Sequence, residues 1–162
     1  MTAAAHKGTW VILASLAAAL FLTLLPLPDW VQDLRPQWVA MTLIYWALTL
    51  PGRVGVFWAW TTGLVMDVAV GSLLGQHALG FAVVAWLAVE LHQRIRVFPP
   101  VQQALTVWVL LLLERLLALW VSGATGQPTP TLWYWAPTLA GVLLWPWLLS
   151  ALRNLHRRFA VA

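Results

Sequence analysis

Apolar residues gather in six runs along this 162-residue chain, each bounded by proline, glycine or charged residues. A helix that crosses a bilayer perpendicular to its plane needs about 20 such residues. Only the last two runs reach that length, and the second, which ends before Pro51-Gly52, has the length of a tilted or partial span. The pattern predicts six transmembrane helices, over residues 9–25, 37–50, 54–70, 78–91, 101–121 and 132–152.

Composition agrees with this pattern. Hydrophobic residues make up 62% of the chain, charged residues 9%, and the mean hydropathy is +0.81, far outside the range of soluble domains. No stretch is long or polar enough to form a second domain, so we expect one all-α transmembrane domain over residues 1–162. The first run follows Lys7 as a signal peptide would. However, it is long for one, and Pro26-Leu27-Pro28 replaces a small-residue cleavage site, which indicates a retained helix.

Basic residues are divided unevenly between the two sides of such a six-helix protein. Both termini share one side with the second–third and fourth–fifth loops, whereas the opposite loops hold Arg35 alone, beside Asp29 and Asp33. Cytoplasmic loops carry the excess of Lys and Arg, so we expect both termini in the cytoplasm. The seven basic residues of this side are Lys7, Arg53, Arg94, Arg96, Arg153, Arg157 and Arg158.

The thirteen tryptophans fit the same geometry, because amphipathic indole rings prefer the membrane–water interface. An aromatic cage for a ligand is a less common arrangement. Pro146, between Trp145 and Trp147, removes a helix hydrogen bond and predicts a kink in the sixth span. We place Trp30, Trp38, Trp120, Trp133 and Trp135 at the outer interface, and Trp10, Trp46 and Trp58 at the inner one.

A four-residue repeat, Gly63-x-x-x-Asp67-x-x-x-Gly71-x-x-x-Gly75, runs through the most apolar part of the chain. Steps of four residues move only about 40° around a helix, so we expect this row on one helix face, where another backbone approaches closely. An acidic side chain at membrane depth costs about 2.5–3.5 kcal/mol on insertion scales. We therefore expect Asp67 to be buried in a packing or coupling contact.

The fifth run carries two further intramembrane charges, Glu114 and Arg115, and Arg115 is expected at a depth similar to that of Asp67. Adjacent helical residues point about 100° apart, so we expect Arg115 to pair with Asp67 while Glu114 faces another neighbour or reaches outward. Two interpretations stay open. The pair either fixes helix register without a further role, or the charges line a polar cavity or a docking point for another membrane protein.

The sequence gives little support for nucleic-acid binding, a metal site or catalysis. The net charge of +4 and pI of about 10.8 come from short basic clusters between apolar runs, which indicates membrane orientation and not nucleic-acid binding. No two histidines share ligand spacing with a carboxylate, and neither Gly-x-Ser-x-Gly nor His-Glu-x-x-His occurs. Ser72 with His77 is the one remote candidate for a nucleophile and base. We expect no enzymatic activity, metal or cofactor.

Several segments together resemble the MreD family of bacterial rod shape-determining membrane proteins. The glycine–aspartate stretch is the most specific of them, and the Tyr-Trp and Trp-Pro-Trp segments are similar to proteobacterial members in particular. In chain order, the segments are Arg35-Pro36-x-Trp38, Tyr45-Trp46-x-Leu48-x-x-Pro51-x-Arg53-Val54-Gly55, Gly63-x-x-x-Asp67-x-x-x-Gly71-x-x-x-Gly75-Gln76-His77-Ala78-Leu79, His92-Gln93-Arg94-x-Arg96-x-Phe98-Pro99-x-x-Gln102-Gln103 and Leu144-Trp145-Pro146-Trp147.

The resemblance implies a six-helix protein of the bacterial inner membrane, embedded in membrane lipids and without known enzymatic activity. Its partners would be MreC, which has one membrane helix and a periplasmic coiled coil, together with the actin-like MreB, the glycosyltransferase RodA and RodA's partner transpeptidase. We expect a non-catalytic scaffold or regulator that binds MreC and helps position peptidoglycan synthesis. Candidates for partner or helix-packing contacts are Gly63, Asp67, Gly71, Gly75 and Arg115.

An alternative function follows from the same resemblance. The family is similar in fold to the substrate-binding components of energy-coupling-factor vitamin transporters, so the chain is alternatively a small-molecule-binding component of such a transporter. Ala14-x-x-x-Ala18 resembles the small-residue docking face of those components, although this spacing is common in packed helices. A transporter component would copurify with a small molecule, and a scaffold with MreC.

Overall fold

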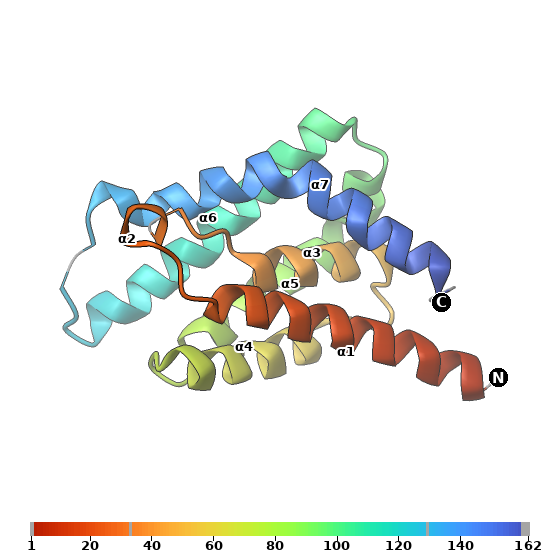
Figure 1. Cartoon of the computed structure of the whole chain (residues 1–162), viewed down its shortest axis with the longest axis horizontal. Coiled ribbons are helices and arrows are strands. Elements are labelled where there is room, and N and C mark those ends of the chain that lie inside the picture. The colour runs from red at the N-terminus through yellow and green to blue at the C-terminus, as the bar shows by residue number, and fades with distance from the viewer. Residues whose placement is uncertain (1, 33, 129, 160–162) are drawn as a thin grey trace.

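The computed structural model describes residues 2–32, 34–128 and 130–159, which form helices and connecting segments without a strand. Asp33, which entered the charge count above, lies outside these residues. A short helix α2 (Asp29–Gln32) and a 3₁₀ helix η1 (Leu132–Trp135) lie in connections between the main helices (Figure 1). The main helices are α1 (Thr2–Leu24), α3 (Trp38–Thr49), α4 (Val56–Val70), α5 (Gln76–Arg96), α6 (Pro100–Ala124) and α7 (Ala136–Arg158).

Proline and glycine set several of the helix ends. Helix α6 begins at Pro100, where the missing N–H of proline costs no helix hydrogen bond. Helix α4 ends at Val70, before Gly71, whose φ of 72° is left-handed, and α5 starts after Gly75, whose φ is 100°. Glycine adopts this conformation without a Cβ clash. The breaks between the apolar runs are therefore close to those that the sequence predicts.

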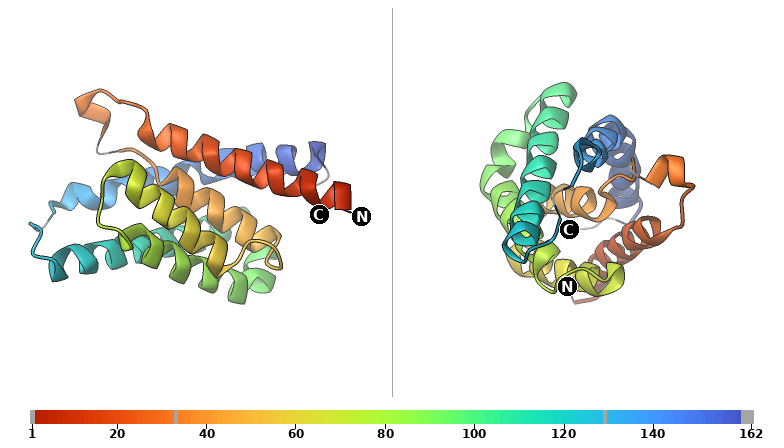
Figure 2. Two further views of the ribbon diagram at one scale, coloured as in Figure 1. Left: turned by 90° about the horizontal axis from the view of Figure 1, so that it is seen from below. Right: turned by 90° about the vertical axis from the view of Figure 1, so that its left-hand side faces the viewer.

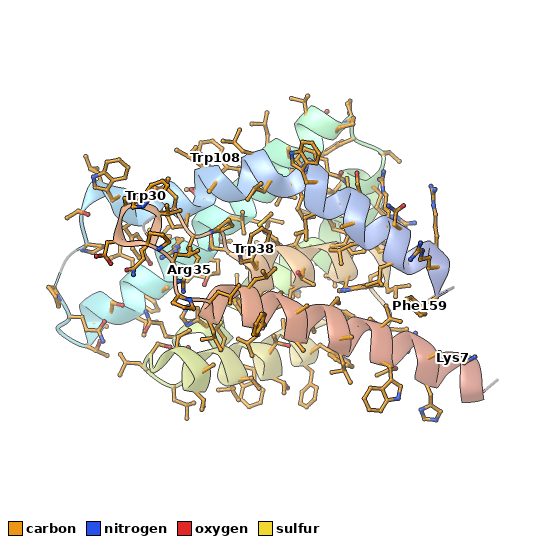
Figure 3. All side chains as sticks on the ribbon, viewed as in Figure 1. Lys7, Trp30, Arg35, Trp38, Trp108 and Phe159 are labelled. Carbon is orange, nitrogen blue, oxygen red and sulfur yellow. The ribbon has the colours of Figure 1, made fainter. Side chains whose placement is uncertain are left out.

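The helices alternate in direction between the two ends of a bundle. Both termini lie at one end, together with the α3–α4 and α5–α6 loops, and the other three connections lie at the opposite end (Figures 1 and 2). Figure 3 places Lys7 near the first end and Arg35 near the second. The seven basic residues on which the orientation was predicted therefore belong to one end of the molecule.

In residues 2–32, 34–128 and 130–159, four segments are long and apolar enough to cross a membrane: His6–Leu24, Gln76–Arg96, Pro100–Ala124 and Leu132–Arg158. The expectation that only the last two would reach this length was wrong. Helix α5 continues past residue 91 with Arg94 and Arg96 in its last turn, where basic side chains interact favourably with the helix dipole. Helices α3 and α4, with 12 and 15 residues, are shorter apolar helices, so the structure has four candidate spans where the sequence predicted six.

Helix α3 occupies the centre of the bundle. All ten residues from 39 to 48 are buried, and the helix contacts α1, α5, α6 and α7; the end view in Figure 2 shows it surrounded by the others. A 12-residue helix is only about 18 Å long, less than the roughly 30 Å hydrocarbon core. Its neighbours therefore shield it, which explains why its sequence is apolar on every side.

Trp46 is an exception to the predicted interfacial belts. It is fully buried in α3, and its indole Nε1 donates a 2.8 Å hydrogen bond to Ser15 Oγ of α1. The prediction placed it at the inner interface because the position of α3 inside the bundle was not apparent from the sequence. A buried indole N–H needs an acceptor, and Ser15 supplies it. The belts predicted from sequence do include strongly exposed side chains at Trp10, Trp30, Trp120 and Trp133.

Pro146 lies inside α7, which continues on both sides of it. Figure 1 shows α7 changing direction about halfway along its length. A proline lacks the N–H for one helix hydrogen bond and its ring crowds the preceding turn, which bends the helix. The kink predicted for the sixth span is present.

Candidate functional site

Asp67 lies near the end of α4 with only 1% of its surface exposed. Its Oδ2 accepts hydrogen bonds from the backbone N–H groups of Gly75 (2.8 Å) and Ala78 (3.4 Å), and its Oδ1 accepts one from the N–H of His77 (2.9 Å). The Ser72 hydroxyl donates to the same Oδ1 at 2.8 Å. One carboxylate thus receives three backbone donors at the start of α5.

This arrangement is a helix N-cap supplied from a neighbouring helix. The first N–H groups of a helix have no partner inside the helix, and an Asp, Asn, Ser or Thr usually satisfies them from the N-cap position. Here that position is Gly75, which has no side chain and makes no cap hydrogen bond of its own. Asp67 replaces the missing cap, and its negative charge is favourable at the positive end of the α5 dipole.

Gly63 permits the close approach of the two helices. A Cβ at this position would lie 2.3 Å from the Cα and 2.6 Å from the backbone N of Ala78. No other residue type fits against that backbone without movement of α5. Gly63 therefore has a packing contact within the chain, one turn of α4 before Asp67.

The prediction that the four-residue row follows one helix face is wrong. Helix α4 ends at Val70, so Gly71 and Gly75 lie in the turn that follows and not on the helix. Nothing lies within 4 Å of a Cβ built at either glycine. Their left-handed backbone, and not close contact with another helix, explains why glycine occupies both positions.

The predicted pairing of Asp67 with Arg115 is also wrong. Among the described residues, the ion pair of Asp67 is with His77, whose Nδ1 lies 2.8 Å from Oδ1. The Arg115 guanidinium lies over the ring of Tyr134, 4.7 Å from its centroid, and the Tyr134 hydroxyl donates a 2.8 Å hydrogen bond to the Arg115 carbonyl oxygen. The donors to the Asp67 carboxylate come from the turn and the start of α5, whereas Arg115 packs on Tyr134.

Ser72, His77 and Asp67 come together without forming a nucleophile–base pair. Ser72 Oγ lies 3.2 Å from His77 Nδ1, the same ring nitrogen that contacts Asp67. In a catalytic triad the nucleophile and the acid use opposite nitrogens of the imidazole, so that one nitrogen accepts a proton while the other is held. Here the Ser72 hydroxyl and the His77 ring both contact the Asp67 carboxylate. The geometry supports a structural cap at this turn.

A polar cavity of about 600 Å³ lies beside this turn, at the end of the bundle opposite the termini. Its walls come from the end of α1, the α2–α3 connection, α4, α5, α6 and the η1–α7 segment. His77 belongs both to the cavity wall and to the Asp67 cap. Its polar and charged wall residues are Thr23, Gln32, Arg35, Gln37, Gln76, His77, Glu114, Arg115 and Tyr134.

Glu114 is the most deeply buried charge in this wall, with 3% of its surface exposed. Its Oε2 accepts a hydrogen bond from Gln37 Nε2, whereas its Oε1 has no partner in the described part of the chain. Gly80 of α5 makes room for it, since a Cβ there would lie 3.2 Å from Glu114 Cγ. Of the two positions expected for Glu114, the structure shows the one that faces another neighbour.

Arg35 closes the wall beside the end of α1. Its two terminal nitrogens donate to the carbonyl oxygens of Thr23 and Leu25, the latter at 2.6 Å. Thr23 lies in the last turn of α1 and Leu25 directly follows the helix, where carbonyl oxygens have no partner inside the helix. Arg35 therefore has a defined structural role, although the sequence analysis used it only in the charge count and the family resemblance.

Sequence reasoning missed His77 and Gln37 as partners of the two buried acids. The Gly75-Gln76-His77-Ala78 segment was a signal, because a glycine followed by a helix start needs a cap from elsewhere. No local spacing indicated Gln37, since it lies 77 residues from Glu114. Ala14 and Ala18, the proposed docking pair, are exposed on α1.

The comparisons with known proteins agree on one family. The family model described as rod shape-determining protein MreD matches residues 5–155. The rod shape-determining protein MreD of Haemophilus influenzae is 30% identical over 152 residues, which cover 92% of each chain. No solved structure matches significantly, so the similarity in fold to vitamin-transporter components stays a prediction. Together with the apolar helices, these matches show that the chain belongs to the MreD family of rod shape-determining, multi-pass membrane proteins.

Proposed function

We propose that this protein is a non-catalytic scaffold or regulator of cell elongation, which binds MreC in the inner membrane and helps position peptidoglycan synthesis by MreB, RodA and RodA's partner transpeptidase. The match of the MreD family to residues 5–155 carries this proposal. The buried acids add to it, because Asp67 caps a helix and Glu114 is bonded to Gln37. Ser72 does contact Asp67, but it lies on the same His77 ring nitrogen as the carboxylate, which is not the arrangement of a nucleophile with its base.

We further propose that all six main helices cross or enter the membrane, with both termini in the cytoplasm. The seven basic residues lie at the end that holds the termini, and cytoplasmic ends carry such an excess. An alkaline phosphatase reporter at the C-terminus should be inactive, and one inserted near Gln127 in the α6–α7 connection should be active. Activity from the C-terminal fusion would contradict this orientation.

An apolar groove between α1 and α4 is the surface that we assign to the single membrane helix of MreC. Its volume is about 520 Å³, and its walls include Leu13, Ala17 and Leu20 of α1. Thr61 and Thr62 face it from α4, but their hydroxyls donate to the carbonyl oxygens of Phe57 and Trp58, at 2.9 and 2.7 Å. The groove is lined by apolar and small side chains, which allow close packing of a helix in lipid.

This choice differs from the residues that the sequence suggested for partner contacts. Gly63 and Asp67 make contacts within the chain, and Arg115 packs on Tyr134. Gly71 and Gly75 have open space beside them, so the α4–α5 turn stays a second candidate for contact with MreC. It is a turn at the end of the bundle, whereas the groove runs between two helices and suits another helix.

Copurification of MreC tests the proposal. Ala17 is exposed on α1, so Ala17→Trp fills the groove from its surface without entering the core. We expect this variant to insert and fold normally, to lose most of the MreC that copurifies in detergent, and to give rounded cells. Ala151→Trp, at an exposed position of α7, is the matched control and should retain MreC. Equal recovery of MreC with both variants would reject the groove as its site.

The alternative, a small-molecule-binding component of a vitamin-type transporter, is favoured by one observation: the polar cavity of about 600 Å³ falls within the usual size range of ligand pockets. The two functions predict different binding partners. A transporter component should copurify with an ATPase-bearing module and show ligand-dependent stabilisation by a vitamin-sized molecule. A scaffold should be stabilised by MreC and keep its role in rod shape without any such molecule.

A further inference from the structure

Four residues in the wall of the polar cavity each have a buried polar atom without a hydrogen-bond partner among the described residues. These atoms are Arg35 Nε, Arg115 Nε, Gln37 Oε1 and Glu114 Oε1, and among the described residues one further such atom, Trp145 Nε1, lies elsewhere. Buried polar groups in native proteins are nearly always hydrogen-bonded, and each one left without a partner destabilises the folded protein. Their concentration in one cavity indicates an occupant that supplies the missing partners.

The four atoms define what the occupant must carry. The two arginine Nε–H groups need acceptors, and the two Oε1 atoms need donors. Guanidinium groups match the oxygens of phosphate in geometry and charge. A carboxylate and an amide oxygen side by side accept from hydroxyl or ammonium groups. A simple anion would satisfy the arginines alone, and an apolar chain would satisfy none of the four.

The position of the cavity agrees with a phosphate ester at the membrane surface. It lies at the end of the bundle that also carries the exposed Trp30 and Trp133, with 83% and 64% of their surfaces accessible; Figure 3 shows Trp30 close to Arg35. Exposed tryptophans mark the depth of the lipid headgroups. The phosphate of a membrane lipid lies at that depth, so this chemistry is available where the cavity opens.

We infer that this cavity binds a phosphate ester that carries a hydroxyl or ammonium donor, with Arg115 and Arg35 on the phosphate oxygens and Glu114 and Gln37 on the donor. Two sources share this chemistry: the headgroup of phosphatidylethanolamine or phosphatidylglycerol, and a water-soluble phosphate ester. The site is independent of the groove assigned to MreC, since the two share only the wall residue Val39.

Lipid selectivity of the unmodified protein tests the inference without any variant. After delipidation in detergent, binding is measured by native mass spectrometry for four lipids with the same acyl chains. Phosphatidylethanolamine and phosphatidylglycerol should bind about tenfold or more tightly than phosphatidylcholine, which lacks a donor on its headgroup, and than diacylglycerol, which lacks the phosphate. Millimolar phosphoethanolamine and glycerol phosphate in a thermal-shift assay form the soluble arm, and stabilisation there alone assigns the site to a free phosphate ester.

A matched pair of variants locates the binding site. Arg115→Met removes the guanidinium, with its charge and N–H donors, keeps much of the side-chain bulk beside Tyr134, and should weaken binding about tenfold. Arg94→Met, at an exposed position near the opposite end of the bundle, should leave it unchanged. Equal binding by these two variants would overturn the assignment. Binding of all four lipids alike, with no effect of the soluble esters, would also overturn it and leave water as the occupant.

Discussion

Replacing Asp67 with alanine is the most direct test of the capped turn. The change removes the acceptor for the N–H groups of Gly75, His77 and Ala78, as well as for the Ser72 hydroxyl. We expect α4 and the body of α5 to persist, because their internal hydrogen bonds and buried faces are untouched. The start of α5 and the α4–α5 turn should open.

The magnitude follows from how deeply each donor is buried. The N–H of Ala78 belongs to a residue with no exposed surface and should cost the full penalty of an unsatisfied donor, about 1–3 kcal/mol. Gly75 and His77 are partly exposed, so water replaces part of what they lose. We therefore expect Asp67→Ala to lower the free energy of unfolding by about 3 kcal/mol in all, more than the roughly 1 kcal/mol typical of a lost N-cap.

Unfolding in detergent and amide hydrogen exchange measure the two effects. Asp67→Ala should lower the free energy of unfolding and speed exchange at residues 75–78, whereas Asp29→Ala, an exposed acid in the first turn of α2, should do neither. The capping argument would be refuted if Asp67→Ala and Asp29→Ala changed the free energy of unfolding by amounts that agree within about 0.5 kcal/mol.

A pair of double-mutant cycles tests which residue is the partner of Asp67. The effects of Asp67→Ala and His77→Ala should not add, because the two side chains contact each other at 2.8 Å. The effects of Asp67→Ala and Arg115→Ala should add within about 0.5 kcal/mol. Strong coupling of Asp67 to Arg115 would show that the originally predicted pair forms after all.

Substitutions at three glycines give further predictions. Gly63→Ala should lower the free energy of unfolding by about 1–3 kcal/mol or more, since its Cβ would lie 2.3 Å from Ala78 Cα; Gly52→Ala, with open space around it, should not. Gly71→Ala should cost about 1 kcal/mol because its φ is 72°. Gly71→Asn should cost less than Gly71→Ala, since asparagine tolerates left-handed backbone. Equal thermal destabilisation by Gly71→Ala and Gly71→Asn would reject the explanation from the left-handed backbone.

The helices of this protein were largely predictable because their limits depend on local chemistry. Pro26 and Pro51 follow the ends of α1 and α3, Pro100 begins α6, and the glycines at 71 and 75 flank the α4–α5 turn. The lengths of the helices were less predictable. Polar residues 92–96 were read as a loop, yet they complete α5, because a helix that reaches the membrane surface can continue with basic residues in its last turn.

The partners of the buried charges could not be read from helical periodicity. The four-residue spacing from Gly63 to Gly75 is compatible with one helix face, and the competing turn signal at Gly71 and Gly75 decided the structure. Once the chain reverses there, Asp67 faces residues 8 to 11 positions ahead of it. Contacts of this kind depend on the path of the turn, which no spacing rule specifies.

Polar motifs are poor guides to the partner surface of a membrane protein for a physical reason. In lipid there is little hydrophobic drive for helix association, and shape and small residues provide most of the contact. The polar side chains that stand out in this sequence are therefore mostly used inside the molecule, Asp67 on the α5 cap and Glu114 in the cavity wall. The groove that we propose for a partner helix, beside Ala17 and Thr61, has an ordinary apolar composition, and the sequence did not distinguish its residues from any other apolar run.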